Sequence, residues 1–573
     1  MRRVARGAGL ILLGLIGVAC SSAPARTAAP PSQIAPPPTQ AVASTPARAT
    51  LSLPASPLGP DQLILHALNR LGYGPRPGDV ERVRRMGLAA YVERQLDPRG
   101  IPDPAVEQAL AAYPVLTLST VALVREYPLP TPQARQRLAS GEMSRPEMME
   151  MYPAERRPAV ITAQMQAARI TRAVASDRQL EEVMVDFWFN HFNVYAQKGA
   201  VRWMLPAYER EAIRPHALGR FRDLVLATAR HPAMLFYLDN WLSTRADLVV
   251  PGGPNAGRRM GLNENYAREL MELHTLGVDG GYTQQDVIEV ARCFTGWTID
   301  RPQQGGGFIF RPLAHDRFAK RVLGQVIPAG GGQQDGERVV EILVRHEATA
   351  RFIATKLARR FVSDDPPAAL VERTAAAFRR TDGDIRAVLT TIFTSPEFWS
   401  ADAYRAKIKT PLEVVASAVR ALDGRIAAAS GADVTGGGGI TLAREVARLG
   451  EPLYEAQPPT GYPDRAEAWV NTGALLGRMN FALGLAHNRF RGARVDVAGF
   501  LANTDRSQPA QVLDRLLAVV LHGEASAQTR AVLAAQLESP EITRTTAYDR
   551  VAKDTDVEKL AALVLGSPEF QRR

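Results

Sequence analysis

His191 is a histidine on the apolar side of a predicted helix, where a buried imidazole needs a hydrogen-bonding partner. We expect this helix from residue 176 to residue 194, because Ser176 and Gln179 have the spacing of a capping box. His191 faces the core, because it continues an apolar stripe formed by Leu180, Val183, Met184 and Phe187. Two interpretations stay open: a core histidine bonded to a backbone carbonyl, or a residue of a functional site.

The residues around His191 are unusually polar for an aromatic stretch of chain. Asn190 directly precedes it and is a candidate binding residue. Asp186 and Asn193 are the other polar neighbours, and they alternate with Phe187, Trp188, Phe189 and Phe192. This density of polar groups favours the functional alternative.

A second segment, residues 261–297, predicts two helices joined by a tight turn. Asn263 can cap the first helix, and Gly277 can end it. After the D-G-G turn, Thr283 and Asp286 have capping-box spacing at the start of the second helix. We expect these two helices to be antiparallel and to pack on something larger.

The first of these helices carries carboxylates on its polar side. On a helical wheel of about 100° per residue, Glu269 and Glu272 share a flank with Asn265. Glu264 and Arg268 have the spacing of an ion pair, and both are candidate binding residues, as is Asn265. The wheel places His274 at the margin of an apolar face formed by Tyr266, Leu270 and Leu273. The alternative to a site is a solvated, salt-bridged helix face.

We predict that His191 and the flank of Asn265, Glu269 and Glu272 converge in one partly buried polar cluster, with His191, Glu269 and Glu272 as candidate catalytic residues. His315 and Asp316, beside a predicted β-hairpin, are further candidates. His191, a carboxylate of the flank and His315 or Asp316 would suit a hydrolytic divalent metal ion. No spacing rule selects such a set, so the metal ligands stay unassigned.

Seven segments spread over most of the chain carry a family resemblance. The longest is residues 261–297, which begins G-L-N-E-N-Y-A-R-E-L. The others are H-A-L-N-R-L-G-Y-G-P-R-P-G-D at 66–79, D-F-W-F-N-H-F-N-V at 186–194, F-I-A-T-K-L-A-R-R-F-V-S-D-D-P-P at 352–367, T-S-P-E-F-W at 394–399, K-T-P-L-E at 409–413 and G-Y-P-D at 461–464. Together they resemble a bacterial family catalogued as domain of unknown function 1800. Glu347 follows His346 where the family usually has a proline.

The resemblance implies an exported protein. It also implies a neighbouring gene for an exported protein that looks like alkaline phosphatases and sulfatases. The family has no agreed catalytic residues, so the resemblance assigns none here.

The N-terminus predicts export and lipid anchoring. Residues 1–19 have a basic start and a short apolar run, as a signal peptide does. Cys20 follows and is the predicted site of lipidation, which would attach the protein to the membrane. Residues 20–60 are rich in Pro, Ala and Ser and predict a disordered tether. Cys293, in a helical pattern, is expected to be a buried thiol.

Helical periodicity dominates from residue 61 to residue 573. We therefore expect a mostly α fold, a large domain of packed antiparallel helices with at most a small β-hairpin. That hairpin is predicted from 308–310 and 321–327, and a C-terminal helical subdomain from about residue 405. The net charge of +10 is spread thinly, which is typical of a solvated surface, so we expect no nucleic-acid partner.

These observations predict a lipid-anchored envelope protein, facing the periplasm or attached to the outer membrane. It would bind, as an accessory, an exported phosphatase-like or sulfatase-like partner. The alternative is an exported hydrolase with a buried His/carboxylate site and a divalent metal ion as cofactor. The sequence leaves open whether the protein is an enzyme.

Overall fold

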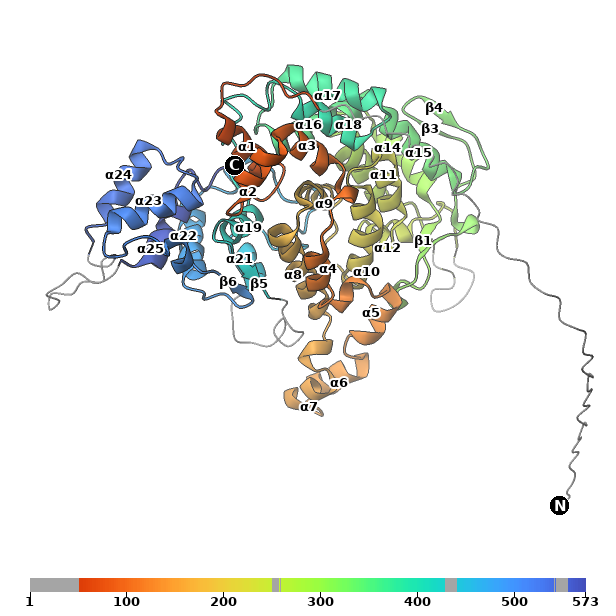
Figure 1. Cartoon of the computed structure of the whole chain (residues 1–573). Helices are drawn as coiled ribbons and strands as arrows, with labels where there is room; N and C mark the ends of the chain where they lie inside the picture. Colours follow the sequence, from red (N-terminus) through yellow and green to blue (C-terminus); the bar gives the residue numbers. More distant parts are fainter. Residues whose placement is uncertain (1–50, 250–256, 258, 428–440, 540–541, 543–554) are drawn as a thin grey trace, which may run out of the picture. The chain divides into compact units, whose positions relative to one another are not determined.

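Helices make up most of the chain, as its periodicity predicts, and the fold is mostly α (Figure 1). The computed structural model describes residues 51–249, 257, 259–427, 441–539, 542 and 555–573. These residues lie within one compact unit, Thr50–Arg573. The signal segment, Cys20 and most of the predicted tether lie outside the described residues.

The described helices up to residue 300 are α1 (Pro60–Arg70), α2 (Asp79–Met86), α3 (Leu88–Leu96), α4 (Pro104–Leu110), α5 (Thr120–Glu126), α6 (Pro132–Ser140), α7 (Arg145–Met151), α8 (Ala159–Ala175), α9 (Gln179–His191), α10 (Val201–Ala207), α11 (Phe221–Arg230), α12 (Pro232–Tyr237), α13 (Asn265–Glu269) and α14 (Gln284–Phe294). Those after it are α15 (Gln334–Arg345), α16 (Glu347–Phe361), α17 (Ala368–Arg380), α18 (Ile385–Phe393), α19 (Pro411–Ala421), α21 (Leu442–Arg448), α22 (Thr472–Ala486), α23 (Pro509–Val520), α24 (Ala527–Gln536) and α25 (Val557–Leu565). None of the helices in these ranges combines the length and the apolar character that crossing a membrane requires.

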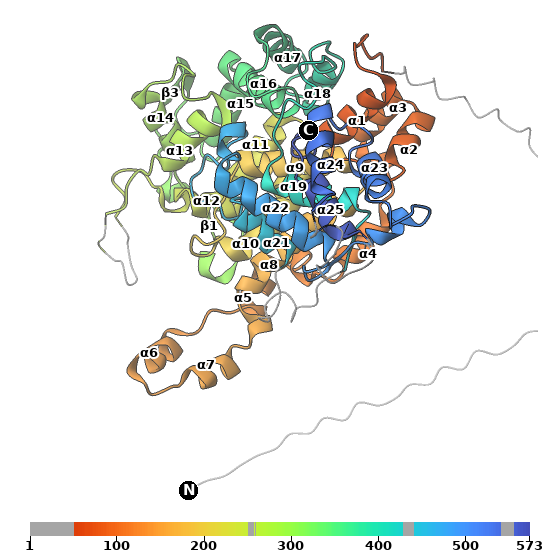
Figure 2. The same ribbon diagram turned by 90° about the vertical axis from the view of Figure 1, so that its left-hand side faces the viewer.

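Helix α8 lies at the centre of the packing. It contacts α4, α9, α10, α19 and α21, which come from both halves of the chain. Helices α16, α17 and α18 pack on one another, and so do α22, α23 and α25 (Figures 1 and 2). Helices α6 and α7 contact each other and project from the body in both views. The predicted subdomain boundary near residue 405 stays a prediction.

Residues 51–60 pack on the folded part, although the sequence assigned them to the tether. Leu51 and Leu53 are partly buried against the core. The hydroxyl of Ser56 donates to the Trp399 carbonyl at 2.6 Å. Residues 51–60 therefore belong with the folded part.

Helix α9 starts later than predicted. The expected capping box is not formed, because the Gln179 side chain is used elsewhere: its oxygen accepts from the Tyr73 amide at 2.8 Å. Ser176 Oγ accepts from the Arg178 amide instead. His191 is buried in the last turn, on the side that its spacing predicts.

The two helices of residues 261–297 are present and pack against each other. Asn263 Oδ1 accepts from the Asn265 amide at 3.0 Å, and Gly277 has a φ of +86° after the helix end. The Thr283–Asp286 capping box is confirmed. Helix α13 does not stay α-helical, because residues Leu270–Thr275 form a π-helix.

Three short antiparallel pairs form the described β structure, and the predicted hairpin is wrong. Strand β2 (Phe308–Phe310) pairs with β1 (Trp297–Ile299), and β3 (Lys320–Val322) pairs with β4 (Gln325–Ile327). The third pair is β5 (Arg425–Ile426) with β6 (Ala493–Arg494). Strand β3 pairs with β4, and not with β2, because a two-residue turn joins β3 to β4. Leu323 and Gly324 form this turn, and both have the positive φ that it requires.

Candidate functional site

Segments that carry the family resemblance meet around one small polar cavity of about 60 Å³. Three carboxyl groups line it, and we call it the acid cavity: Asp186 on α9, Glu451 after α21, and Asp464 in the G-Y-P-D segment. Arg360 on α16 and Thr410 before α19 line it too. Residues scattered over almost 300 positions of the chain thus share one site.

Arg169 on α8 orients one side of the acid cavity. Its guanidinium donates to Asp186 at 2.5 Å, to Glu209 at 2.8 Å and to the Tyr454 hydroxyl at 3.1 Å. Tyr454 in turn donates to Glu209 at 2.7 Å. Burial alone would raise the pKa of Glu209, but Arg169 and its neighbouring arginines outweigh this effect and lower it. All three nitrogens of the Arg169 guanidinium are therefore paired, and Asp186 is held in place.

The backbone around this ion cluster is also irregular. Glu209 lies in a π-helix, Tyr208–Ile213, that follows α10. Tyr454 has a φ of +66°, which is costly for a residue with a bulky side chain. Such irregularities are frequent at functional sites.

A second ion cluster fixes the other side of the cavity. Arg360 pairs with one oxygen of Glu413 at 2.8 Å, and Arg573 pairs with the other at 3.0 Å. Lys407 pairs with Asp464 Oδ1 at 3.0 Å. Burial would raise the pKa of Asp464, but Lys407, Arg360 and Arg573 lower it instead. Asp464 is consequently a carboxylate at neutral pH.

Two buried polar atoms at this cavity have no hydrogen-bond partner among the described residues: Arg360 Nε and Asp464 Oδ2. Arg360 is only 5% exposed. Buried polar atoms are nearly always paired, so an unpaired donor and an unpaired acceptor beside one cavity need an explanation. A polar ligand that offers both an acceptor and a hydroxyl would pair with them.

Glu451 differs from Asp464 in its protonation. One of its oxygens accepts from the Leu412 amide at 2.8 Å. Burial raises the pKa of Glu451 to about 8, and the charge of Asp186 adds to the effect. At neutral pH, a carboxylic acid and a carboxylate therefore line the same cavity.

His191 lies on the same helix as Asp186, but its bonds go elsewhere. One ring nitrogen is 3.0 Å from the His274 carbonyl, and the other is 2.9 Å from Lys356 Nζ. The carbonyl can only accept, so Nε2 carries the hydrogen and Nδ1 accepts from Lys356. Burial lowers the pKa of His191, and Lys356 lowers it further. His191 therefore has the partner expected of a core histidine, which is a backbone carbonyl.

The polar flank of residues 261–277 is satisfied by its own neighbours. Asn265 donates to the Leu238 carbonyl, and Glu272 accepts from the Tyr282 hydroxyl at 3.0 Å. Burial and the charge of Glu272 raise the pKa of Glu269. Glu264 and Arg268 form the expected i, i+4 ion pair. The hydrogen bonds of the flank and those of His191 thus have separate partners.

The remaining candidates lie beside the short strands. His315 is buried, with its ring nitrogens near the Thr295 carbonyl and Asp335. Asp316 pairs with Arg292 at 2.9 Å. Asn190 exchanges two bonds with the backbone of Tyr462 and so helps to shape the acid cavity. In the described ranges, no three His, Cys, Asp or Glu side chains are grouped as metal ligands.

Sequence reasoning missed the centre of this site. Arg169, Arg360, Glu451 and Asp464 were not among the candidates. A signal for Arg169 was present, because it follows Met165 by four residues on the apolar side of a long predicted helix. An arginine at such a position needs buried acids.

The comparisons with known proteins identify a family whose description names no reaction. A family model described as "Protein of unknown function (DUF1800)" matches residues 66–572. No curated protein and no solved structure matches the chain.

Proposed function

The chain belongs to the family described as protein of unknown function (DUF1800), whose description states no activity, and we propose from the acid cavity that it is an exported, lipid-anchored hydrolase. One observation carries the proposal: Glu451 and Asp464, whose surroundings shift their pKa values in opposite directions, line one cavity beside Arg360 Nε, which has no partner among the described residues. Acid–base hydrolysis needs this pair of protonation states.

Glycosidic bonds are the substrate class that this pair suits, because two carboxyl groups suffice for their hydrolysis. Glu451 donates its proton to the leaving oxygen as the bond to the sugar carbon breaks. A water molecule attacks that carbon, and Asp464 Oδ2 accepts the proton that the water loses. Asp464 then releases its proton to solvent and Glu451 regains one, so both carboxyl groups return to their starting states and the protons balance.

Parts of the cavity lining suit contacts with a sugar, but the volume of about 60 Å³ is smaller than that of a ligand pocket, so the lining must open for a sugar ring to enter. Arg360 Nε–H would donate to a ring or hydroxyl oxygen. The rings of Tyr462 and Trp469 line the cavity with their centroids 6.2 Å apart, and aromatic rings offer apolar surface to sugar faces.

The test is hydrolysis of a panel of bacterial envelope polysaccharides, followed by the release of reducing ends. Glu451→Gln and Asp464→Asn should each lower the rate by about 10²–10⁴-fold, which is the usual contribution of a general acid or base. Glu455→Gln, outside the cavity but in the same loop, is the matched control and should keep the rate. If the wild type releases no more reducing ends than Glu451→Gln on every substrate, the hydrolase proposal is wrong.

A second function, binding to an exported phosphatase-like or sulfatase-like protein, is favoured by the projecting α6–α7 pair. Leu129, Met149 and Met151 are exposed on and beside it. Flexible methionine side chains suit apolar partner surfaces. Met149→Glu with Met151→Glu should abolish co-purification with the neighbouring gene product, and Val532→Glu, an exposed valine on α24, should not. Equal recovery with all variants would contradict this role.

A further inference from the structure

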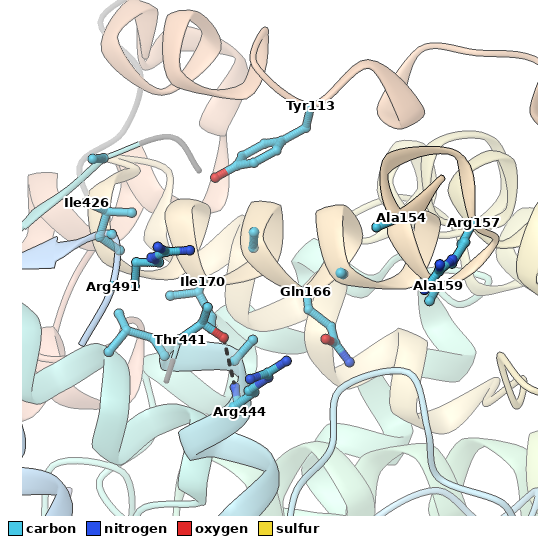
Figure 3. A pocket seen from close by; sticks show the side chains of 16 residues that line it. Tyr113, Ala154, Arg157, Ala159, Gln166, Ile170, Ile426, Thr441, Arg444 and Arg491 are labelled. Carbon is cyan, nitrogen blue, oxygen red and sulfur yellow. Dashed lines mark hydrogen bonds between the residues drawn. The ribbon is translucent and has the colours of Figure 1, made fainter. Parts of the chain in front are cut away.

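A second, larger pocket is lined by residues of α8 that do not line the acid cavity, and the proposed reaction does not use it. It has a volume of about 330 Å³ and is bounded by α8, by β5 and by α21. Figure 3 shows Ile426 and Arg491 at one end, Ala159 and Arg157 at the other, and Arg444 between them. This volume is within the range of small-molecule sites.

The walls of this pocket are largely apolar. Ala159, Ala163 and Ala167 follow one another at four-residue spacing on α8, and Ile170 continues the same face. Ile426 and Leu442 face them from β5 and α21. The small alanine side chains leave room beside α8, so an apolar chain can lie along the helix and be removed from water.

The charged groups of this pocket all have one sign. Arg157, Arg444 and Arg491 line it, and no Asp or Glu is among the described residues that do so. Arg157 donates to the Tyr152 carbonyl. A carbonyl has no net charge, so this bond does not neutralise the charge of Arg157. Arg444 is exposed, on the first turn of α21. Guanidinium groups bind carboxylates and phosphates, often through two hydrogen bonds.

We infer that this arginine-rimmed pocket binds an amphipathic anion, a ligand with one apolar chain and one carboxylate or phosphate head group. The chain would lie against the alanine face of α8, and the head group would meet Arg444. The inference goes beyond the proposed hydrolase function and does not rest on it. The same chemistry is found in a free fatty acid and in an anionic lipid of the membrane.

The direct test is calorimetric titration of the full chain carrying Cys20→Ser with dodecanoate, dodecanol and dodecylammonium. We expect saturable binding of one dodecanoate, weaker binding of dodecanol and the weakest binding of dodecylammonium. Arg444→Glu should weaken dodecanoate binding by about fivefold or more, a factor that corresponds to ~1 kcal/mol. Equal affinities for the three probes would overturn the inference.

Two further variants separate the pocket from the general positive charge of the protein. Arg380→Glu, at an exposed position on α17, makes the same charge change outside the pocket and should leave the affinity unchanged. Ala163→Trp should fill the space beside α8 and abolish binding of both dodecanoate and dodecanol, with an unfolding temperature close to that of the wild type. If Arg380→Glu weakens binding as much as Arg444→Glu, the pocket is not the site.

Vesicles distinguish the two sources of the anion. If the ligand is a membrane lipid, vesicles of phosphatidylglycerol should retain the wild type more strongly than Arg444→Glu, and phosphatidylcholine vesicles should retain both equally. If it is a free fatty acid, dodecanoate should bind as described above, and each vesicle type should retain the wild type and Arg444→Glu equally. Failure of dodecanoate and of phosphatidylglycerol together would overturn the inference, whatever the result of the hydrolase assay.

Discussion

Arg169→Met should destabilise the fold far more than the loss of an ordinary ion pair. The Arg169 side chain is 4% exposed and neutralises two acids, Asp186 and Glu209. Methionine keeps much of the volume but leaves Asp186 without its cation, and Glu209 keeps only its pairs with Arg172 and Arg214. Removal of one partner from a buried pair typically costs ~3–5 kcal/mol, because the other charge stays buried and uncompensated. We expect a decrease of that size in the free energy of unfolding, measured by guanidinium chloride titration at pH 7.

The pH dependence of this loss has a defined direction. The folded-state pKa of Glu209 is lowered below its unfolded value, so its stabilisation is complete above about pH 4.5 and is lost as the pH falls further. Arg169→Met removes the largest favourable contribution to that stabilisation, while Arg214 and Arg172 remain. The difference between wild type and variant should therefore be largest near neutral pH and smaller at pH 4.

Two variants make the reasoning refutable. Arg84→Met breaks an exposed pair with Asp61, whose side chains are 48% and 60% exposed, and should cost far less stability, because solvent screens such a pair. Arg169→Met with Glu209→Gln should recover part of the loss, because one uncompensated charge is removed as well. A loss for Arg169→Met no greater than for Arg84→Met, or one that is independent of pH, would refute the ion-cluster argument.

Three further outcomes follow from the site and the N-terminus. Hydrolysis should decline as the pH rises above about 8, because Glu451 acts in its protonated form; a rate profile that is flat from pH 6 to 10 would contradict this role. Burial, with Lys356, lowers the pKa of His274 to about 3, so the unfolded chain binds more protons below about pH 6.5, and stability falls with the pH. By pH 5 this effect reaches ~2 kcal/mol. His274→Asn should therefore lose less free energy of unfolding than the wild type between pH 7 and pH 5, and equal losses in the two proteins would contradict this; unfolding titrations at both pH values measure the difference. Cys20→Ser should move the protein from the membrane fraction to the soluble fraction or leave it unprocessed, and equal partition of both proteins would exclude lipidation.

Local patterns predicted local structure well. The Thr283–Asp286 capping box, the end of the helix before Gly277 and the burial of His191 all follow from spacing along a few residues. The hairpin prediction failed for the same reason, because the turn at Leu323 and Gly324 is a stronger local signal than the likeness of two distant apolar runs.

The helical wheel failed where the helix changes its pitch. It assumes about 100° per residue, but Leu270–Thr275 are π-helical and advance by less per residue. The wheel put Leu273 on the apolar face and His274 at its margin. In the structure His274 is buried and Leu273 is only partly so. Nothing in the local sequence marks this change of pitch, and every residue after it is misplaced on the wheel.

The acid cavity could not be found from spacing, because its ion pairs join distant segments. Arg169 and Tyr454 are separated by 285 positions, and Asn190 and Tyr462 by 272. What the sequence did contain was the set of segments that resemble the family, and four of the seven contribute residues to the lining of the cavity. Their convergence is visible only after the chain has folded.

The ion clusters beside the cavity are costly for stability, and that cost bears on their role. Buried ion pairs are often no more stable than apolar groups of the same volume, because both charges lose their hydration. Arg169, Glu209, Arg360 and Glu413 nevertheless lie in the interior of a fold that buries apolar residues almost everywhere else. Packing alone does not require them there. Their common effect is to hold Asp186 in place and to lower the pKa of Asp464, while burial raises the pKa of Glu451, for which the described residues offer no ion-pair partner. If these charges served stability alone, replacing them together by apolar side chains would change the free energy of unfolding little and have no other effect. If they serve an acid–base site, the same replacement would abolish hydrolysis.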